Sequence, residues 1–199
     1  LAPNPACVAP SAVKSRIAPY TPQALDEAGI QKQLADFANC AALARQAGYD
    51  GVEIIGSAGY LLSTFLVQKT NLRADAWGGP FENRMRFPVE VVRRVRAAVG
   101  TDFILIFRIS AMDMLEGGLA WDEIVTLARA VEAAGANILS THFCWHEAPV
   151  PTIATMVPRA AFASVTGRLR KAVTVPVIAS TGIDTPGVAV RVLARGDAD

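Results

Sequence analysis

Two hydrophobic patterns alternate along the chain. Short, almost continuously apolar runs rich in β-branched residues are separated by longer segments in which apolar residues recur every three or four positions. The short runs predict strands at Gly51–Ile55, Phe103–Ile109, Asn137–Ser140 and Val175–Ala179. The longer segments predict helices at Ile30–Ala47, Phe87–Ala98, Trp121–Ala134, Ala160–Ala172 and from about Thr185 to Gly196. The predicted order is therefore one helix followed by four strand–helix units.

This alternation predicts an α/β fold with a parallel sheet. Strands that are apolar on both faces are typical of covered parallel sheets, and strands that alternate with helices favour parallel pairing. Two architectures have this layout, a doubly wound sheet and part of a (β/α)8 TIM barrel. A Gly-x-Gly-x-x-Gly loop would favour the doubly wound sheet, but Gly56-x-x-Gly59 is only a partial match. The long loops after the first three strands favour a partial barrel, of which four units make half.

Composition and charge narrow the classes of function. The chain has 199 residues, which is the size of one domain. Its 19 basic and 18 acidic residues give a net charge of +1, which argues against a nucleic-acid surface. No apolar run approaches the ~18 residues of a membrane span. The sequence therefore predicts neither a nucleic-acid partner nor a membrane partner.

Cysteine usage and the two ends of the chain give further expectations. Cys7, Cys40 and Cys144 form no Cys-x-x-Cys pair, so no metal cluster is expected within the chain. Sparse cysteines and the absence of a visible signal peptide indicate a reducing compartment, and we expect a cytoplasmic protein. The chain starts without Met and stops where another strand would begin, so we expect an internal fragment.

Two polar side chains near strand ends are candidates for chemistry. Tyr60 follows the first predicted strand by about five residues, and its phenol has an ordinary pKa near 10. It could donate a proton to a carbanion or enolate, or simply pack its ring in a loop. Arg108 lies inside an apolar strand, where a guanidinium needs a partner. That partner is either a carboxylate such as Glu53 or an electron-rich cofactor or oxyanion.

Two histidines, His142 and His146, follow the third predicted strand. With Cys144 and Glu147 they could suggest a metal site, but the prolines that come next disfavour the helical turn that such ligands need. A histidine that exchanges protons near neutral pH fits this position better, and a plain loop histidine is the alternative. After the fourth strand, Ser180-Thr181-Gly182 could offer backbone N–H groups to a phosphate or form a tight turn.

Several longer motifs resemble the old yellow enzyme family of FMN-dependent oxidoreductases. The segments that carry this resemblance are Ala47–Ile54, Gly59–Leu62, Asn71–Gly79 and Glu82–Phe87. Within that family, Val8–Ala12, Trp145–Ala148 and Pro151–Arg159 are similar to the bacterial 2,4-dienoyl-CoA reductase branch. The resemblance runs along essentially the whole chain. It implies that residues 1–199 form part of an FMN-binding TIM barrel, roughly its fourth to seventh strands.

The resemblance also implies roles for individual residues. Many members hold the substrate carbonyl with a histidine pair, or with His and Asn, where this chain has Ile55 and Ala58, and the dienoyl-CoA branch lacks them too. Reduced FMN would deliver a hydride from N5 to a conjugated enoyl or dienoyl thioester, while Tyr60 donates the proton and His146 assists. Arg108 would lie beside the flavin ring. The residues that would face the FMN phosphate are Ser180, Thr181 and Gly182.

An acyl-CoA substrate and NAD(P)H as the electron source follow from the same resemblance. The residues that would fall near the acyl-CoA are Lys69, His146, Glu147, Ala148 and Pro149. The branch usually has Arg where Lys69 and Pro149 stand, and Asn-Arg where Thr181-Gly182 stands, so a different enoyl or dienoyl substrate is an alternative. A 4Fe-4S cluster, FAD and NADPH would bind elsewhere in the full-length protein.

Other functions are open on sequence grounds. The alternatives are a relative within the same family, such as an enoate reductase or an amine dehydrogenase, and a truncated chain that binds no flavin. Half a barrel also exposes the edges of its sheet, so the isolated chain is expected to fold poorly or to associate.

Overall fold

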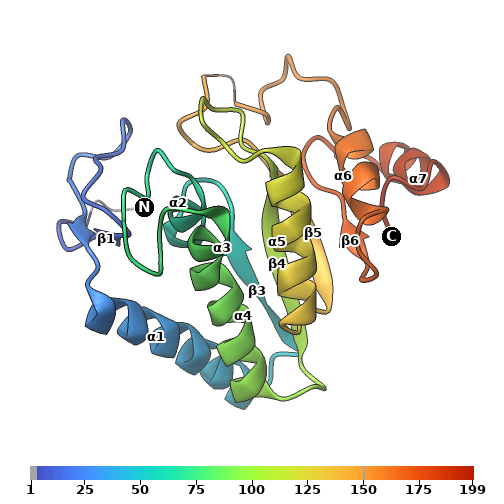
Figure 1. Ribbon diagram of the computed structural model, residues 1–199. Coiled ribbons are helices and arrows are strands. Elements are labelled where there is room, and N and C mark those ends of the chain that lie inside the picture. The colour runs from blue at the N-terminus through green and yellow to red at the C-terminus, as the bar shows by residue number, and fades with distance from the viewer. Residues whose placement is uncertain (1–3, 150) are drawn as a thin grey trace.

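The centre of the molecule is a four-stranded parallel sheet. The computed structural model describes residues 4–149 and 151–199. The strands pair in chain order, each with the next (Figure 1), and they are β3 (Gly51–Gly56), β4 (Ile104–Met112), β5 (Ile138–Phe143) and β6 (Val177–Ile178). The predicted strands and their parallel pairing are confirmed.

The strands differ in length from the prediction. The strand β3 ends one residue later than predicted, at Gly56, and β5 ends three residues later than predicted, at Phe143. The strand β4 runs three residues past Ile109 because its pairing with β5 continues, with an irregularity between Ser110 and Met112. The strand β6 is only two residues long. Pro176 precedes it and has no N–H for the ladder, although its carbonyl accepts a hydrogen bond from the amide of Leu139 at 3.0 Å.

Seven helices accompany the sheet in the described chain. They are α1 (Glu27–Gln46), α2 (Leu61–Leu66), α3 (Phe81–Arg84), α4 (Arg86–Val99), α5 (Trp121–Ala133), α6 (Ala163–Arg170) and α7 (Pro186–Ala194). The short helices α2 and α3 were not predicted, since neither is long enough for a helical repeat to stand out. The helix α1 starts earlier than predicted because Asp26 caps it, accepting a hydrogen bond from the Gly29 amide at 2.7 Å. The helix α6 starts three residues later than predicted, and Ala160 has a φ of +53°.

The two faces of the sheet have different surroundings. The helices α4 and α5 cover one face (Figure 1), and the core there includes Phe87 from α4 and Phe107 from β4, both fully buried. The other face carries Glu53, Ile55 and Arg108, and Ile55 is 40% exposed. In a closed barrel this face would be filled by side chains of the remaining strands. The sheet therefore has one covered face and one open face, as a partial barrel requires.

A loop at residues 10–22 closes on itself near the start of the chain. The strands β1 (Val8–Ala9) and β2 (Gln23–Ala24) pair in parallel and hold the two ends of the loop together. Arg73 fixes the same ends from outside, donating hydrogen bonds to the carbonyls of Pro10, at 3.0 Å, and Leu25. We call residues 10–22 the strap.

No helix of the described chain is both long and apolar enough to cross a membrane.

Candidate functional site

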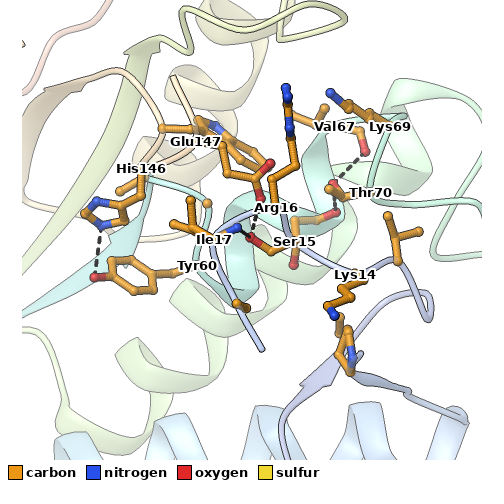
Figure 2. Close-up of a pocket in the computed structure, with 18 of the residues that line it drawn as sticks. Lys14, Ser15, Arg16, Ile17, Tyr60, Val67, Lys69, Thr70, His146 and Glu147 are labelled. Atoms are coloured by element: carbon orange, nitrogen blue, oxygen red, sulfur yellow. Dashed lines mark hydrogen bonds between the residues drawn. The ribbon is translucent and has the colours of Figure 1, made fainter. Parts of the chain in front are cut away.

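A large cavity opens beside the carboxyl ends of β3 and β5. Its volume is about 1120 Å³, above the ~300–1,000 Å³ of most small-molecule sites. The segments that line it include residues 13–20 of the strap, 58–61, 69–70, 114–116 and 145–147. Figure 2 shows Ser15 and Arg16 of the strap next to Glu147 of the segment after β5, with Tyr60 and His146 to the left of them and Lys69 to the right. The carboxyl ends of parallel strands are where α/β barrels place their active sites.

The structure brings Tyr60 and His146 together. Tyr60 is the residue directly before α2, and His146 comes three residues after β5. The Tyr60 hydroxyl lies 3.0 Å from Nε2 of His146, with the rings edge to face at 5.2 Å between centroids (Figure 2). Both side chains line the cavity, and Tyr60 is 40% exposed. A phenol and an imidazole in this contact can pass a proton between them and to a bound molecule.

Most of the residues expected near the substrate line the same cavity. Lys69, Glu147 and Pro149 all contribute to its wall. Glu147 accepts a hydrogen bond of 2.5 Å from the Ser15 hydroxyl, which ties the strap to the segment that carries His146 (Figure 2). Ala148 lies in a turn between Glu147 and Pro149, where its amide donates a hydrogen bond to the carbonyl of Trp145 at 2.9 Å. It is not among the residues that line the cavity.

Three cations stand along this cavity without an acidic partner. Lys14 and Arg16 come from the strap, and Lys69 follows α2. None of the ion pairs of the described chain includes them. Figure 2 shows the side chains of Arg16 and Lys69 pointing to the same side. Two unpaired cations in this position would attract an anion such as a phosphate group. The sequence reasoning missed Lys14 and Arg16, because isolated basic residues in a loop carry no pattern.

Arg108 lies on the open face of the sheet, outside the cavity. Its Nε donates to Oε1 of Glu53 at 3.0 Å, so the carboxylate alternative of the sequence reasoning is present in the structure. Its Nη1 donates to no residue that the structure describes. With a side chain that is 37% exposed, Arg108 has N–H groups left for a ligand on this face.

The segment after β6 forms a turn with free amide groups. Thr181 and Gly182 have φ values of +69° and +72°. The carbonyl of Gly182 accepts a hydrogen bond from the amide of Ala160 at 2.9 Å, and the hydroxyl of Ser180 donates to the carbonyl of Thr141. Neither Thr181 nor Gly182 donates its own amide hydrogen to a residue within the described ranges. The turn is therefore real, and its N–H groups are also available to an anion.

His142 sits on β5 and points to the same open face as Arg108. Burial lowers the pKa of His142 most, and the charge of Arg108 lowers it further. The described residues contain no group of three or more His, Cys, Asp and Glu side chains that could hold a metal ion.

A buried acid beneath the His146 segment was not found from the sequence. Asp113 follows β4 and is 4% exposed. Its carboxyl group accepts hydrogen bonds from the Ser110 hydroxyl at 2.6 Å, the Trp145 indole at 2.8 Å and the Leu119 amide at 2.7 Å. The strand was predicted to end at Ile109, four residues before Asp113. Asp113 directly follows the observed end of β4 at Met112, and an acidic residue at the carboxyl end of a strand is the signal that could have identified it.

Comparison with known proteins agrees with this geometry. A family model described as NADH:flavin oxidoreductase / NADH oxidase family matches residues 3–199. The chain belongs to this family. A protein named metal reductase from Desulforamulus reducens is 43% identical over 192 residues, which is 96% of this chain and 29% of the relative. The chain thus spans less than a third of the length of this relative.

Solved structures of the family share the fold. A 2-naphthoyl-CoA reductase in complex with 2-naphthoyl-CoA superposes with a TM-score of 0.91 at 32% identity, covering 96% of this chain and 29% of that one. An old yellow enzyme homologue from Zymomonas mobilis gives a TM-score of 0.77 at 28% identity, covering 96% of this chain and 55% of that one. The predicted α/β barrel architecture is confirmed, and the four strands form part of such a barrel.

Membership of this family implies FMN, and two features of the structure fit it. Arg108 presents free N–H groups on the open face of the sheet, where an electron-rich ring could lie. Thr181 and Gly182 present free amide groups at the carboxyl end of β6, where barrels often hold phosphates. Of the residues that the sequence assigned to FMN, Arg108, Thr181 and Gly182 therefore have hydrogen-bonding capacity left for it, whereas the Ser180 hydroxyl already donates to Thr141.

Proposed function

We propose that this chain carries the catalytic residues of an FMN-dependent NAD(P)H oxidoreductase that reduces a conjugated C=C bond of an enoyl or dienoyl thioester. The observation that carries the proposal is the 3.0 Å contact between the Tyr60 hydroxyl and Nε2 of His146 in a cavity lined by unpaired cations. The bacterial 2,4-dienoyl-CoA reductase branch of the family is the form of this chemistry that the motifs favour.

The chain's own residues would manage the proton. Bound reduced FMN would supply the hydride, and the substrate then carries negative charge spread over its conjugated thioester. Tyr60 donates its phenolic proton to the substrate carbon that must gain it, and His146 hydrogen-bonds the phenolic oxygen as its charge grows. Solvent reaches both side chains from the cavity and restores the proton afterwards.

The cations support a substrate with phosphate groups. Arg16 and Lys69 lie on one side of the cavity and Tyr60 on its wall, so an acyl group near Tyr60 could extend to an anionic tail beside the two cations. The similarity to a 2-naphthoyl-CoA reductase, whose structure holds a CoA thioester, agrees with this arrangement. Electrons from NAD(P)H would reach FMN through the parts of the full-length protein outside this chain, where 4Fe-4S and FAD are expected.

The test is substrate-driven reoxidation of the reduced flavin in the full-length protein. The protein is reduced anaerobically with NAD(P)H and mixed in a stopped-flow instrument with a 2,4-dienoyl-CoA, with an unconjugated acyl-CoA as the matched control. We expect rapid reoxidation with the conjugated thioester and none with the control. A ferric complex is the competing acceptor, because the relative from Desulforamulus reducens is named a metal reductase. Reoxidation by the ferric complex but not by the dienoyl-CoA would overturn the proposal.

A further inference from the structure

The buried acid Asp113 is linked through Trp145 to Tyr60 and His146, which we call the catalytic pair. Its Oδ1 accepts a hydrogen bond from Nε1 of Trp145 at 2.8 Å, and its backbone carbonyl accepts one from the amide of Trp145 at 3.0 Å. Trp145 is 3% exposed and directly precedes His146. Asp113 therefore holds both the main chain and the indole of the residue before His146.

The same indole also contacts the turn that carries Tyr60. A Cβ atom added to Gly59 would lie 3.0 Å from Cε3 of Trp145, so the indole packs directly on the backbone of Gly59. The φ of Gly59 is +89°, a conformation that also favours glycine. On the other side, the amide of His146 donates to the carbonyl of Ala58 at 3.2 Å. The indole of Trp145 thus fills the space between the two segments that meet in the catalytic pair.

We infer that Asp113 is a positioning residue, which sets the contact between Tyr60 and His146 by fixing the Trp145 indole. Three donors satisfy its carboxyl oxygens, namely the Ser110 hydroxyl, the Leu119 amide and the Trp145 indole. The first two donors belong to β4 and the loop after it. The acid is therefore fixed at the end of β4, and through Trp145 it holds the segment that follows β5. Asp113 is not among the residues that line the cavity, whereas Trp145 is, so Asp113 acts on the geometry of the site through Trp145.

This inference rests on the proposed function only for its effect on rate. A displacement of about 1 Å in a catalytic group can lower a rate on the order of 10²-fold. Trp145→Phe keeps a ring against Gly59 and removes the N–H donor, and Asp113→Asn keeps the size of the acid while replacing one acceptor oxygen with a donor. The chain offers a matched control in Trp77→Phe, because Nε1 of Trp77 donates to Oε2 of Glu27 at 2.7 Å, away from the cavity.

The first readout needs no substrate. The full-length protein is treated with diethyl pyrocarbonate, which modifies unprotonated imidazole nitrogens, and the rates at His146 and His142 are followed by peptide mass spectrometry. We expect Trp145→Phe and Asp113→Asn to raise the rate at His146 several-fold and to leave His142 unchanged. Tyr60→Phe gives the rate for a His146 released from its partner. An unchanged His146 rate in both folded variants would overturn the inference.

The second readout separates positioning from stability. With a substrate accepted by the wild type, we expect both Trp145→Phe and Asp113→Asn to lower kcat about tenfold or more. For Asp113→Asn, whose side chain is not part of the cavity lining, KM should stay within about twofold and flavin reduction by NAD(P)H should be unchanged. Trp77→Phe should lower the melting temperature without changing kcat. If kcat falls by the same factor in Trp145→Phe and in Trp77→Phe, the hydrogen bond of Trp145 contributes to stability rather than to positioning, and the inference is overturned. Absence of thioester reduction in the wild type would instead contradict the proposed function and leave the His146 modification test decisive.

Discussion

The Tyr60 hydroxyl and Nε2 of His146 lie 3.0 Å apart although 86 residues separate them in the chain. The parallel sheet is the reason, because Tyr60 follows β3 and His146 follows β5, and the carboxyl ends of parallel strands meet at one edge. Taken alone, neither the loop after β3 nor the loop after β5 has a pair of side chains that could exchange a proton in this way. Only the order β3-β4-β5 places the phenol against the imidazole.

Loss of the Tyr60 hydroxyl should slow turnover with little effect on folding. We expect Tyr60→Phe in the full-length protein to lower kcat on the order of 10²-fold, the scale of losing a general acid. The side chain is partly exposed, and among residues 4–149 and 151–199 its hydroxyl hydrogen-bonds only to His146, so the melting temperature should change little. Steady-state reduction of a conjugated thioester measures the effect. Tyr49→Phe, at a tyrosine that is 67% exposed, is the control, and a near-normal kcat for Tyr60→Phe would remove Tyr60 from its role.

A double variant tests whether the two side chains act together. If His146 works through the phenol, His146→Gln added to Tyr60→Phe should cost much less than the product of the two single effects. Fully multiplicative losses would show that His146 acts on the substrate independently of Tyr60.

The framework could be predicted from the sequence because it depends on repeated local signals. Apolar runs bounded by turn residues identified all four strands of the sheet, and alternation with helices predicted their parallel order. The pairing of Arg108 with Glu53 followed from a charge placed inside an apolar strand, although the cofactor alternative was considered beside it. These inferences need only neighbouring residues and general energetics.

The parts that sequence reasoning missed depend on contacts between distant segments. Ser15 meets Glu147 across 132 residues, and the tie between the strap and the His146 segment cannot be read from either loop alone. Asp113 was missed because the end of β4 was placed three residues early, and boundaries are the least certain part of a strand prediction. An error of three residues in a strand end is enough to hide a buried polar group, because the residue next to the true end is buried by neighbouring segments.

The unpaired cations make substrate binding sensitive to charge. We expect the double variant Arg16→Gln and Lys69→Gln to raise KM for an acyl-CoA on the order of tenfold, with kcat nearly unchanged, because both side chains lie away from Tyr60 and His146 (Figure 2). The wild-type KM should rise with added salt, and that of the variant should rise less. Kinetics with the matching pantetheine thioester, which lacks the diphosphate, provide the control. An equal rise in KM for both substrates would contradict a role in binding phosphate.

Arg73 should control the mobility of the strap. Its guanidinium joins the carbonyls of Pro10 and Leu25 at the two ends of the strap and also pairs with Asp75, with 3.0 Å between Nε and Oδ1. Lysine cannot make these contacts together, because it has one nitrogen instead of a planar fork. We expect Arg73→Lys to increase tryptic cleavage at Lys14 and Arg16 several-fold. Arg93→Lys, at an exposed arginine of α4, is the matched control, and equal cleavage of the two variants would contradict the role of Arg73.

His142 should make stability depend on pH. Burial and the charge of Arg108 lower its pKa in the folded chain below the ordinary value of 6.5, so the unfolded chain binds the proton more tightly. Stability from the neutral side chain is therefore complete above pH 6.5 and is lost as the pH falls below that value. His142→Gln cannot be protonated, so its melting temperature should fall less than that of the wild type between about pH 7.5 and pH 5. Similar melting temperatures at pH 7.5 would establish that the variant is folded. An equal acid-induced decrease in both proteins would show that His142 is not the group responsible.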